Sequence, residues 1–423
     1  MHVLLPLLIS LVLAQSTEPP TSWIDPDTGH RVVRLTTEPG SASLYFNQNG
    51  YTPDGTRLIY TTPNGISTLD LRTHQAKQVV TGRVRMIEAG HKNPRVYYVR
   101  EDKVYWTNVD TGETHEIGTL PRRGSVSTVN ADETLIAGTY IEGDGKDYNN
   151  NRPAQTPATS TASAPAAAGA QGHPLDQPTN KGQMMEERLA AHLPMGLFTI
   201  NVQTGEVKTI HRATDWLNHL LFSPTDPTLL MFCHEGPWHK VDRIWTIRTD
   251  GSKVTKIHTR TMAMEIFGHE FWSADGKTIW YDLQTPRGED FWLAGYHVDT
   301  GERTWYHLQR DEWSIHFNVT RDGTLMTGDG GDPGQVAKAQ NGRWIYLFRP
   351  ELLEDKGLPD PHFVRPGVLH AERLVNMSKH EYRLEPNVSF TPDQQWVVFR
   401  SNMFGATYVF AVEVAKRANT DSR

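Results

Sequence analysis

The sequence contains very little cysteine, and it has only one long apolar run. Cys233 is the single cysteine among 423 residues, so no disulfide can form within the chain. The run MHVLLPLLISLVLAQS lies at the start and is too short to cross a bilayer. It has no Lys or Arg near its beginning, but the small residues around Ala14 are typical of signal cleavage. We expect a signal peptide at residues 1–14, a periplasmic or secreted protein and no membrane attachment afterwards; a buried N-terminal segment is the alternative.

Positive charge is not in excess either. The 42 Lys and Arg residues are outnumbered by 49 Asp and Glu residues, and the formal net charge is -7. This balance disfavours nucleic-acid binding. An anionic ligand would have to be held by local cations, because the overall field does not attract it. We expect a monomer or a weak homodimer.

Long stretches of helical periodicity are also scarce, whereas residues typical of short strands and turns are abundant. The chain has 12 Trp, 14 Tyr and 14 Phe beside 34 Gly and 26 Pro. One hairpin signal, two apolar segments separated by a turn that in most copies contains Asp, recurs along the chain. The seven copies begin at Tyr51, Ala89, Val129, Phe222, Phe267, Asn318 and Ser389.

These repeats predict an all-β fold. After most copies comes a second hairpin, such as KVYWTNVDTGETHEI, so each unit supplies about four strands, the content of one propeller blade. We expect a seven-bladed β-propeller with four-stranded blades, as a single domain over residues 23–416. The strand His30–Thr36 precedes the first unit, and the last unit lacks an obvious fourth strand. This N-terminal strand should therefore complete the last blade and close the ring.

The spacing between two repeats leaves room for an insertion at about residues 141–195. Its first part, Asn151–Pro178, is rich in Pro, Ala, Ser and Thr, so it cannot bury a core and should be disordered. Its second part has apolar residues at four-residue spacing, which predicts a short amphipathic helix. These residues are Met185, Leu189 and Leu193.

Polar residues of the first strand of each unit fall into one register. When the repeats are aligned on the Ser, Thr or Asn before each turn, the residue four positions earlier is polar in five of the seven units. The first strand of each blade lines the central channel of a propeller, so these residues should share one mouth of it. They are Gln48, Met86, Val126, His219, His269, His316 and Asn387.

The second strand of each blade returns to the same mouth and brings more polar residues to it. A lone His in a strand is more often structural than catalytic, and Arg243 could equally form an ion pair with Asp242 or Glu235. Three His residues in one register are less easily explained in that way. The residues expected to join the funnel from later strands and loops are His234, Glu235, Arg243, Glu385, Arg400 and Asn402.

The motifs FCHEGP, VDRIW, GHEFW, IHFNVTRDGTLMTGDG and NVSFTPD follow one another in this order and spacing. In them the chain resembles the oligogalacturonate lyases, which are seven-bladed propellers that degrade pectin fragments. The likeness is strongest from about Trp216 to Phe404. It implies that His269 is the catalytic base and that Arg243 contacts the substrate carboxylate.

The resemblance also implies a metal. The family holds manganese with three His and one Gln, and His316 matches the first of these His residues. Where the others would stand, this chain has Tyr382, Glu385 and Asn387. Glu385 and Asn387 can still bind a hard cation through oxygen, so with His316 the site would favour Mn²⁺, Ca²⁺ or Mg²⁺. Alternatively, the metal is absent.

The expected reaction is β-elimination on an acidic oligosaccharide, with a 4,5-unsaturated uronate as product. Removal of the C5 proton builds negative charge on the neighbouring carboxylate, so the site must supply a base and fixed positive charge. The alternatives are a lyase for a glucuronate- or rhamnose-containing oligosaccharide and a non-catalytic periplasmic propeller of the TolB-like type. Candidate substrate-binding residues are His219, His234, Glu235, Arg400, Asn402 and Gln48.

Overall fold

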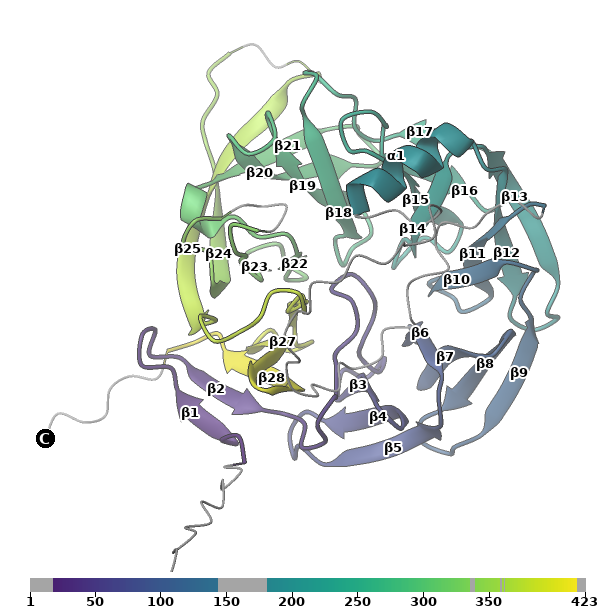
Figure 1. Cartoon of the computed structure of the whole chain (residues 1–423). Helices are drawn as coiled ribbons and strands as arrows, with labels where there is room; N and C mark the ends of the chain where they lie inside the picture. The colour runs from purple at the N-terminus through teal and green to yellow at the C-terminus, as the bar shows by residue number, and fades with distance from the viewer. Residues whose placement is uncertain (1–17, 144–180, 335–338, 358–359, 361, 417–423) are drawn as a thin grey trace, which may run out of the picture.

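A computed structural model describes residues 18–143, 181–334, 339–357, 360 and 362–416. The signal peptide expected at residues 1–14 and the Pro- and Ala-rich segment Asn151–Pro178 lie outside these residues. The described chain forms a ring of radially arranged sheets around a central axis (Figure 1). No helix in this part of the chain is long and apolar enough to span a membrane.

The strands of the described chain form seven blades, as predicted. Blade 1 consists of β3 (Arg57–Thr62), β4 (Gly65–Asp70) and β5 (Ala76–Thr81). Blade 2 consists of β6 (Arg85–Ala89), β7 (Arg95–Arg100), β8 (Lys103–Asn108) and β9 (Thr114–Thr119). Blade 3 consists of β10 (Gly124–Val129), β11 (Leu135–Ile141), β12 (Met195–Asn201) and β13 (Val207–Ala213). Blade 4 consists of β14 (Trp216–Phe222), β15 (Leu229–Glu235), β16 (Ile244–Arg248) and β17 (Thr255–Lys256).

The remaining blades come from the second half of the chain and from the N-terminal strands. Blade 5 consists of β18 (Ile266–Trp272), β19 (Thr278–Gln284), β20 (Phe291–His297) and β21 (Arg303–Leu308). Blade 6 consists of β22 (Phe317–Val319), β23 (Met326–Gly328), β24 (Trp344–Leu352) and β25 (Val364–Asn376). Blade 7 consists of β26 (Ser389–Phe390), β27 (Trp396–Phe404), β28 (Ala406–Glu413), β2 (Arg31–Arg34) and β1 (Ser22–Ile24).

The repeated turn explains why the same hairpin forms again and again. In four copies a Thr or Ser hydroxyl donates to the Asp two residues later, and that Asp accepts the backbone N–H two residues further on. In blade 5, for example, Ser273 donates to Asp275 at 2.5 Å and Asp275 accepts from the Lys277 N–H at 3.0 Å. Gly276 follows with φ 69°, a value that Gly adopts without strain. The other copies centre on Asp54, Asp322 and Asp393.

The N-terminal strand closes the ring, as the sequence predicts. β2 pairs antiparallel with β28, the last strand of the chain, with Val32 opposite Val412. β1 then pairs with β2 and adds a fifth strand that the sequence did not indicate. Blade 7 is therefore held together by hydrogen bonds between the two ends of the described chain.

Two blades depart from the simple repeat. In blade 1, residues 42–51 take the place of a regular inner strand and touch β3 through two isolated bridges, Ala42 with Thr61 and Tyr51 with Leu58. In blades 5 and 6 the outer strands β21 and β25 pair in parallel, which joins the two blades into one eight-stranded sheet. The first departure lies in the segment that carries Tyr45 and Asn47, described below.

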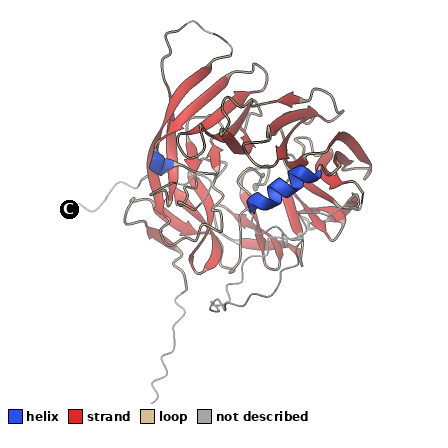
Figure 2. Cartoon of the chain, turned by 45° about the horizontal axis from the view of Figure 1, so that its top comes forward, coloured by secondary structure: helices blue, strands red, loops and turns tan. Residues whose placement is uncertain are grey.

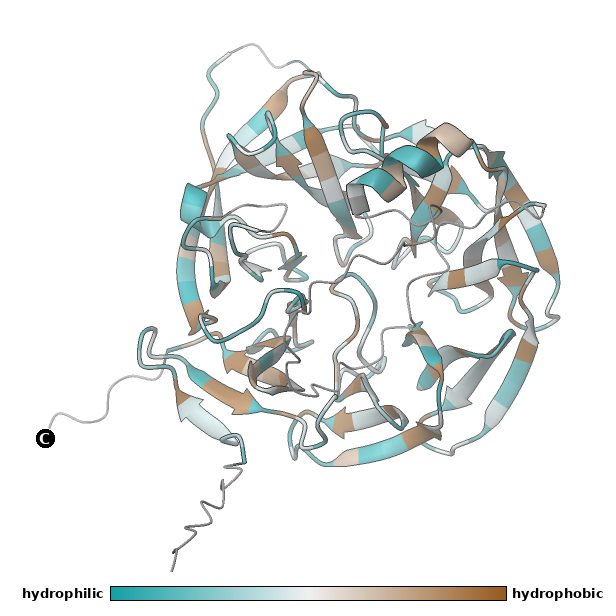
Figure 3. Ribbon diagram, in the orientation of Figure 1, coloured by the Kyte–Doolittle hydropathy of each residue, from teal (hydrophilic) through white to brown (hydrophobic). Residues whose placement is uncertain are grey.

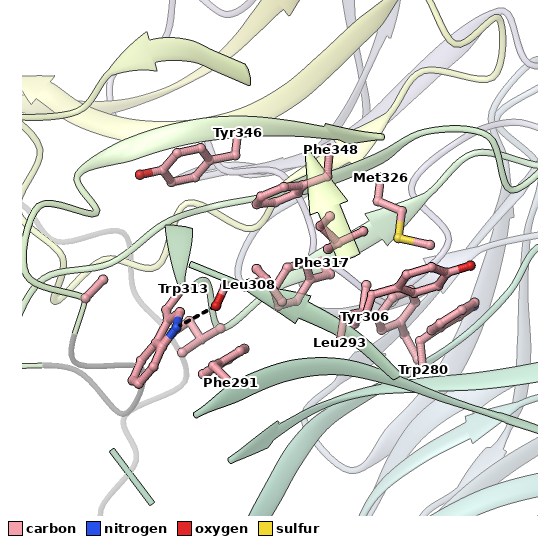
Figure 4. Close-up of a cluster of buried hydrophobic side chains, with 14 of the residues drawn as sticks. Trp280, Phe291, Leu293, Tyr306, Leu308, Trp313, Phe317, Met326, Tyr346 and Phe348 are labelled. Carbon is pink, nitrogen blue, oxygen red and sulfur yellow. Dashed lines mark hydrogen bonds between the residues drawn. The ribbon is translucent and has the colours of Figure 1, made fainter. Parts of the chain in front are cut away.

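The hydrophobic core lies between neighbouring blades. Apolar and polar residues alternate along many strands (Figure 3), so each blade presents apolar side chains to the next blade. The cluster between blades 5 and 6 contains Phe291, Trp313, Phe317 and Phe348 (Figure 4), all almost fully buried. The Trp313 indole N–H donates to the Leu308 carbonyl at 3.4 Å.

Helical structure is sparse in the described chain (Figure 2). A short 3-10 helix, η1, spans Arg310–Glu312. The helix α1 spans Lys181–Ala191, inside the segment for which the sequence predicts an amphipathic helix. Its Met185 is buried in the core cluster that includes Trp216, and its Arg188 lies over the Trp216 ring at 4.2 Å. The helix thus packs against blade 4.

Ring closure can be tested through Val32, which is fully buried in β2. Val32→Asp places a charge without a partner in the core, and we expect it to lower the free energy of unfolding by about 3 kcal/mol or more. Val207→Asp is the matched control, because Val207 lies on a strand but is 40% exposed, and it should cost about 1 kcal/mol or less. Urea unfolding measures both. Equal losses in the two variants would mean that β2 is not needed to close the ring.

Candidate active site

The inner strands of four blades have an irregular register, typical of a β-bulge, at corresponding positions. Register shifts occur in β6, β10, β14 and β18, in each case at or next to the position that the sequence alignment placed in one register. His219, His269 and Asn387, three of the aligned residues, have positive φ values of 48°, 50° and 54°. Positive φ is uncommon for residues other than Gly, although His and Asn adopt it more often than most, and such strain is concentrated at functional sites. The aligned residues therefore share a special backbone environment.

His269 on β18 is oriented by a carboxylate on the neighbouring strand. Its Nδ1 lies 2.9 Å from Oδ1 of Asp282, which is paired across the ladder with Gly268. Because a carboxylate only accepts hydrogen bonds, Nδ1 carries the hydrogen and Nε2 keeps a lone pair. Burial lowers the pKa of His269, but the charge and hydrogen bond of Asp282 outweigh it, so the pKa is raised above its ordinary value. His269 is built as a proton acceptor.

His316, at the start of blade 6, repeats this arrangement. Its Nδ1 lies 2.6 Å from Oδ2 of Asp329, and its own N–H donates to Oδ1 at 3.1 Å. Its Nε2 lies 3.2 Å from the Tyr45 hydroxyl and 3.9 Å from the Glu385 carboxylate. The His316 ring meets the His269 ring edge-on, with centroids 5.1 Å apart. The two histidines therefore belong to one cluster.

Arg243, which precedes β16, is held by two carboxylates of the protein itself. Its Nε donates to Oε1 of Glu270, and its Nη2 lies 3.4 Å from Oε2 of the same residue. Its Nη1 lies 3.9 Å from Glu235, and Glu235 also lies 3.4 Å from His219 Nε2. Burial raises the pKa of the Glu270 carboxyl, but the charge of Arg243 outweighs it and the pKa is lowered. Glu270 thus occupies the Nε and Nη2 edge of Arg243, the residue for which the resemblance implies a contact with the substrate carboxylate.

Blade 7 contributes Glu385, Asn387 and Arg400. Arg400 Nε donates to the Glu385 carbonyl at 2.8 Å, and the Asn387 amide nitrogen donates to the same carbonyl at 3.3 Å. Asn387 Oδ1 is buried and has no hydrogen-bond partner among the described residues. Such an atom is costly unless a ligand or ion satisfies it.

Three predicted site residues are held elsewhere. Gln48 donates to the Ile87 carbonyl at 2.8 Å and accepts from the Tyr45 N–H, so it anchors a loop. His234 points to the opposite face of β15 from Glu235, because side chains alternate along a strand, and it binds Asp215 at 2.9 Å. Asn402 accepts from the Glu381 N–H at 2.9 Å. The structure thus brings His219, Glu235 and Arg400 to the cluster, but not these three.

Sequence reasoning missed several members of the cluster. The segment before β3 reaches into the centre of the ring (Figure 1), where Asn47 donates to the Glu270 carbonyl at 2.9 Å and Tyr45 meets His316. The aromatic and polar letters YFNQNG before the first hairpin are the signal for this segment. Asp282 and Asp329 could have been found by pairing each inner His with the strand that follows it.

Among the described residues, the cluster has more negative than positive charge. Two described guanidinium groups, those of Arg243 and Arg400, face five carboxylates. The carboxylates are Glu235, Glu270, Asp282, Asp329 and Glu385. A negatively charged ligand would therefore need further positive charge in the site.

The donors around His316 fit a divalent cation. In the described part of the chain, no group of three or more His, Cys, Asp and Glu side chains is arranged to hold a metal. The set formed by His316, Glu385 and Asn387 relies instead on an amide oxygen, the buried Oδ1 of Asn387. One nitrogen and two oxygen donors suit a borderline or hard ion such as Mn²⁺ or Ca²⁺. Tyr382 is not part of this set, because its hydroxyl donates to the Asp329 carbonyl in the core.

Known proteins resemble this chain in sequence and in fold. The family model described as oligogalacturonate lyase matches residues 177–418. An oligogalacturonate lyase of Dickeya dadantii (strain 3937) is 26% identical over 412 residues, which cover 93% of this chain and 95% of the relative. A solved oligogalacturonate lyase in complex with manganese has a TM-score of 0.72 at 22% identity and covers 93% of this chain and 96% of its own. The Vibrio parahaemolyticus oligogalacturonate lyase has a TM-score of 0.70 at 24% identity, with the same coverage.

The two solved structures establish the propeller fold. The family model covers more than half of the chain and includes His269, Arg243, His316 and the blade 7 residues of the cluster. The chain therefore belongs to the oligogalacturonate lyase family and is a lyase that acts on oligosaccharides.

Proposed function

We propose that this protein cleaves oligogalacturonates by β-elimination and releases a product with a 4,5-unsaturated uronate at its new non-reducing end. The observation that carries the proposal is the Asp282–His269 pair, which holds a proton acceptor in a cluster that also contains the buried Arg243 and Arg400. The Dickeya and Pectobacterium relatives, which are named for cleavage of oligogalacturonates, support this substrate class.

The reaction needs one base at C5 of the uronate. In the proposed mechanism Nε2 of His269 takes the C5 proton, the electron pair forms the C4–C5 double bond, and the C4–O4 bond breaks. Asp282 keeps the imidazole in the tautomer that has its lone pair on Nε2, and it stabilises the imidazolium that forms. The imidazolium gives up the proton it has taken to solvent water, and water returns a proton to the leaving O4 to give the shortened sugar chain.

The site must also stabilise the negative charge that gathers on the uronate carboxylate as the proton leaves. Fixed positive charge in a water-poor channel does this well, because the donors need no reorganisation during the reaction. Arg400 and Arg243 are the cations of the cluster, and both are less than a tenth exposed. The burial of these guanidinium groups strengthens their effect on a bound anion.

A divalent cation would add to this positive charge. One solved family member holds manganese, and in this chain His316, Glu385 and Asn387 would be the ligands. When bound, the ion would supply Lewis-acid neutralisation of the uronate carboxylate. Asp329 fixes the His316 ring so that Nε2 is presented to that side of the site, the usual task of a carboxylate behind a ligating histidine.

The base is tested by His269→Ala. We expect turnover of trigalacturonate to fall by roughly 10²- to 10⁴-fold while binding persists, because the positioned base is lost and the carboxylate contacts remain. The ultraviolet absorbance of the unsaturated product in single-turnover experiments measures the rate. His370→Ala, a substitution at an exposed histidine, should keep the wild-type rate.

A wild-type rate in His269→Ala would assign the base to another residue of the cluster. A panel that also contains glucuronate- and rhamnose-containing oligosaccharides would show whether a different uronate is the preferred substrate. No product from any uronide would contradict the proposed function itself.

The pH dependence follows from the raised pKa of His269. The base is active only when deprotonated, so activity should rise with pH through a midpoint above the ordinary His value of about 6.5. Asp282→Asn removes the charge that raises this pKa, so the midpoint should move to lower pH while the maximal rate falls. The pH profile of kcat/KM measures both changes. An unchanged midpoint in Asp282→Asn would show that another group controls the profile.

The metal is tested by chelation. We expect metal-stripped protein to lose most of its activity and Mn²⁺ or Ca²⁺ to restore it, because the cluster has too few cations for an anionic substrate. Asn387→Asp replaces an amide ligand with a carboxylate and should tighten Mn²⁺ binding by about 10-fold or more. Calorimetric titration with Mn²⁺ measures the affinity. Full activity after chelation, with no Mn²⁺ binding in either protein, would remove the ion from the mechanism.

A further inference from the structure

Arg400 differs from Arg243, the other guanidinium of the cluster, in the partners that its nitrogens have. It lies on β27, the second strand of blade 7, and is 8% exposed. Its Nε is fixed by the Glu385 carbonyl at 2.8 Å. Its two terminal nitrogens form no hydrogen bond or ion pair with any described residue. They also do not belong to the fully buried side-chain atoms that lack a hydrogen-bond partner. The guanidinium is therefore held at Nε, and its two terminal nitrogens are open to a ligand.

Arg243 is in the opposite state. One edge of its guanidinium, formed by Nε and Nη2, is occupied by Glu270, and Nη1 is directed toward Glu235. A carboxylate of the substrate would have to compete with these buried carboxylates for the same donors. Ion pairs lead to the same conclusion, because two carboxylates form ion pairs with the Arg243 guanidinium, whereas no described carboxylate forms one with the Arg400 guanidinium.

The position of Arg400 suits the carboxylate of a uronate whose C5 faces the base. Arg400 donates to the backbone carbonyl of Glu385, and the Glu385 side chain lies 3.9 Å from His316. The His316 ring in turn contacts the His269 ring. The uronate carboxylate is bonded directly to C5. If Arg400 holds the uronate carboxylate, the C5 proton of the same uronate therefore stays within the cluster that contains His269.

We propose that Arg400 makes the two-pronged contact with the uronate carboxylate and so selects the free acid over its methyl ester, while Arg243 acts as a positioning residue that neutralises Glu270 and Glu235. This inference rests on the proposed function, because it assigns the carboxylate contact of the same reaction. It differs from the role expected for Arg243 from the sequence. It also gives a reason for the open fork of Arg400, since a guanidinium binds a carboxylate through two parallel N–H donors.

The test crosses two substrates with three variants. Trigalacturonate and its methyl ester are compared on wild-type protein, Arg400→Gln, Arg400→Lys and Arg243→Lys, with kcat and KM determined separately. For Arg400→Gln we expect kcat/KM to fall roughly 30- to 100-fold on the free acid and less than about 3-fold on the ester. Arg400→Lys should still lose about 10-fold on the acid, because Lys offers a point charge and no fork. Arg349→Gln, at an exposed site, is the matched control and should behave as wild type.

Binding of the same two compounds, measured by calorimetry on wild type and on the variants, separates this inference from the proposed function. If no uronide is cleaved, the proposed function fails, and Arg400 is judged on whether Arg400→Gln loses affinity for the acid alone. Equal losses on acid and ester, wild-type behaviour of Arg400→Gln, or an acid-selective loss in Arg243→Lys would each overturn the assignment to Arg400. Failure of the wild type to bind the acid would overturn it as well.

Discussion

The site depends on the closure of the ring by β2. The cluster takes Tyr45 from blade 1, Arg243 from blade 4, His269 from blade 5, His316 from blade 6 and Arg400 from blade 7. Blades 7 and 1 are neighbours only because β2 supplies the hydrogen-bonding partner of β28 before the chain turns into blade 1. Without that pairing the ends of the sheet series would be free edges, and only local contacts, such as that of Asn47 with the Glu270 carbonyl, would hold the Tyr45 hydroxyl 3.2 Å from His316. A contact between the chain ends thus controls distances at the centre of the ring.

Buried charge is the second constraint, and it explains the special backbone. Arg243 and Glu270 are both nearly inaccessible, and breaking such a buried pair by removing one partner typically costs about 3–5 kcal/mol. Glu270 reaches Arg243 because the ladder of β18 shifts between Gly268 and Phe271, where His269 takes a φ of 50°. The same bulge directs His269 toward Asp282. The strain of one residue therefore places both the base and the carboxylate that holds Arg243.

The sequence predicts local structure well and side-chain partners poorly. The turns could be read because each one is made by residues two positions apart, such as Ser273 and Asp275. The parallel pairing of β21 with β25 could not, because it joins residues about 60 positions apart and has no local signature. The sequence alone could have separated His234 from Glu235, since the alternation of side chains along a strand sets the two residues on opposite faces. Gln48 lies in an irregular segment, where no periodicity indicates which way a side chain points.

The charge balance of the cluster links the metal ligands to the contact with the substrate carboxylate. In the described part of the site five carboxylates surround two guanidinium groups, yet the proposed substrate is itself an anion. Arg243 is already shared between Glu235 and Glu270, so it offers little net attraction to a further carboxylate. The attraction must come from the other half of the cluster, where Arg400 has an open fork and Asn387 Oδ1 is buried without a partner. A cation bound beside Arg400 would satisfy that oxygen and offset Glu385 and Asp329. The metal ligands and the carboxylate contact are therefore expected to act together on the carboxylate of the substrate.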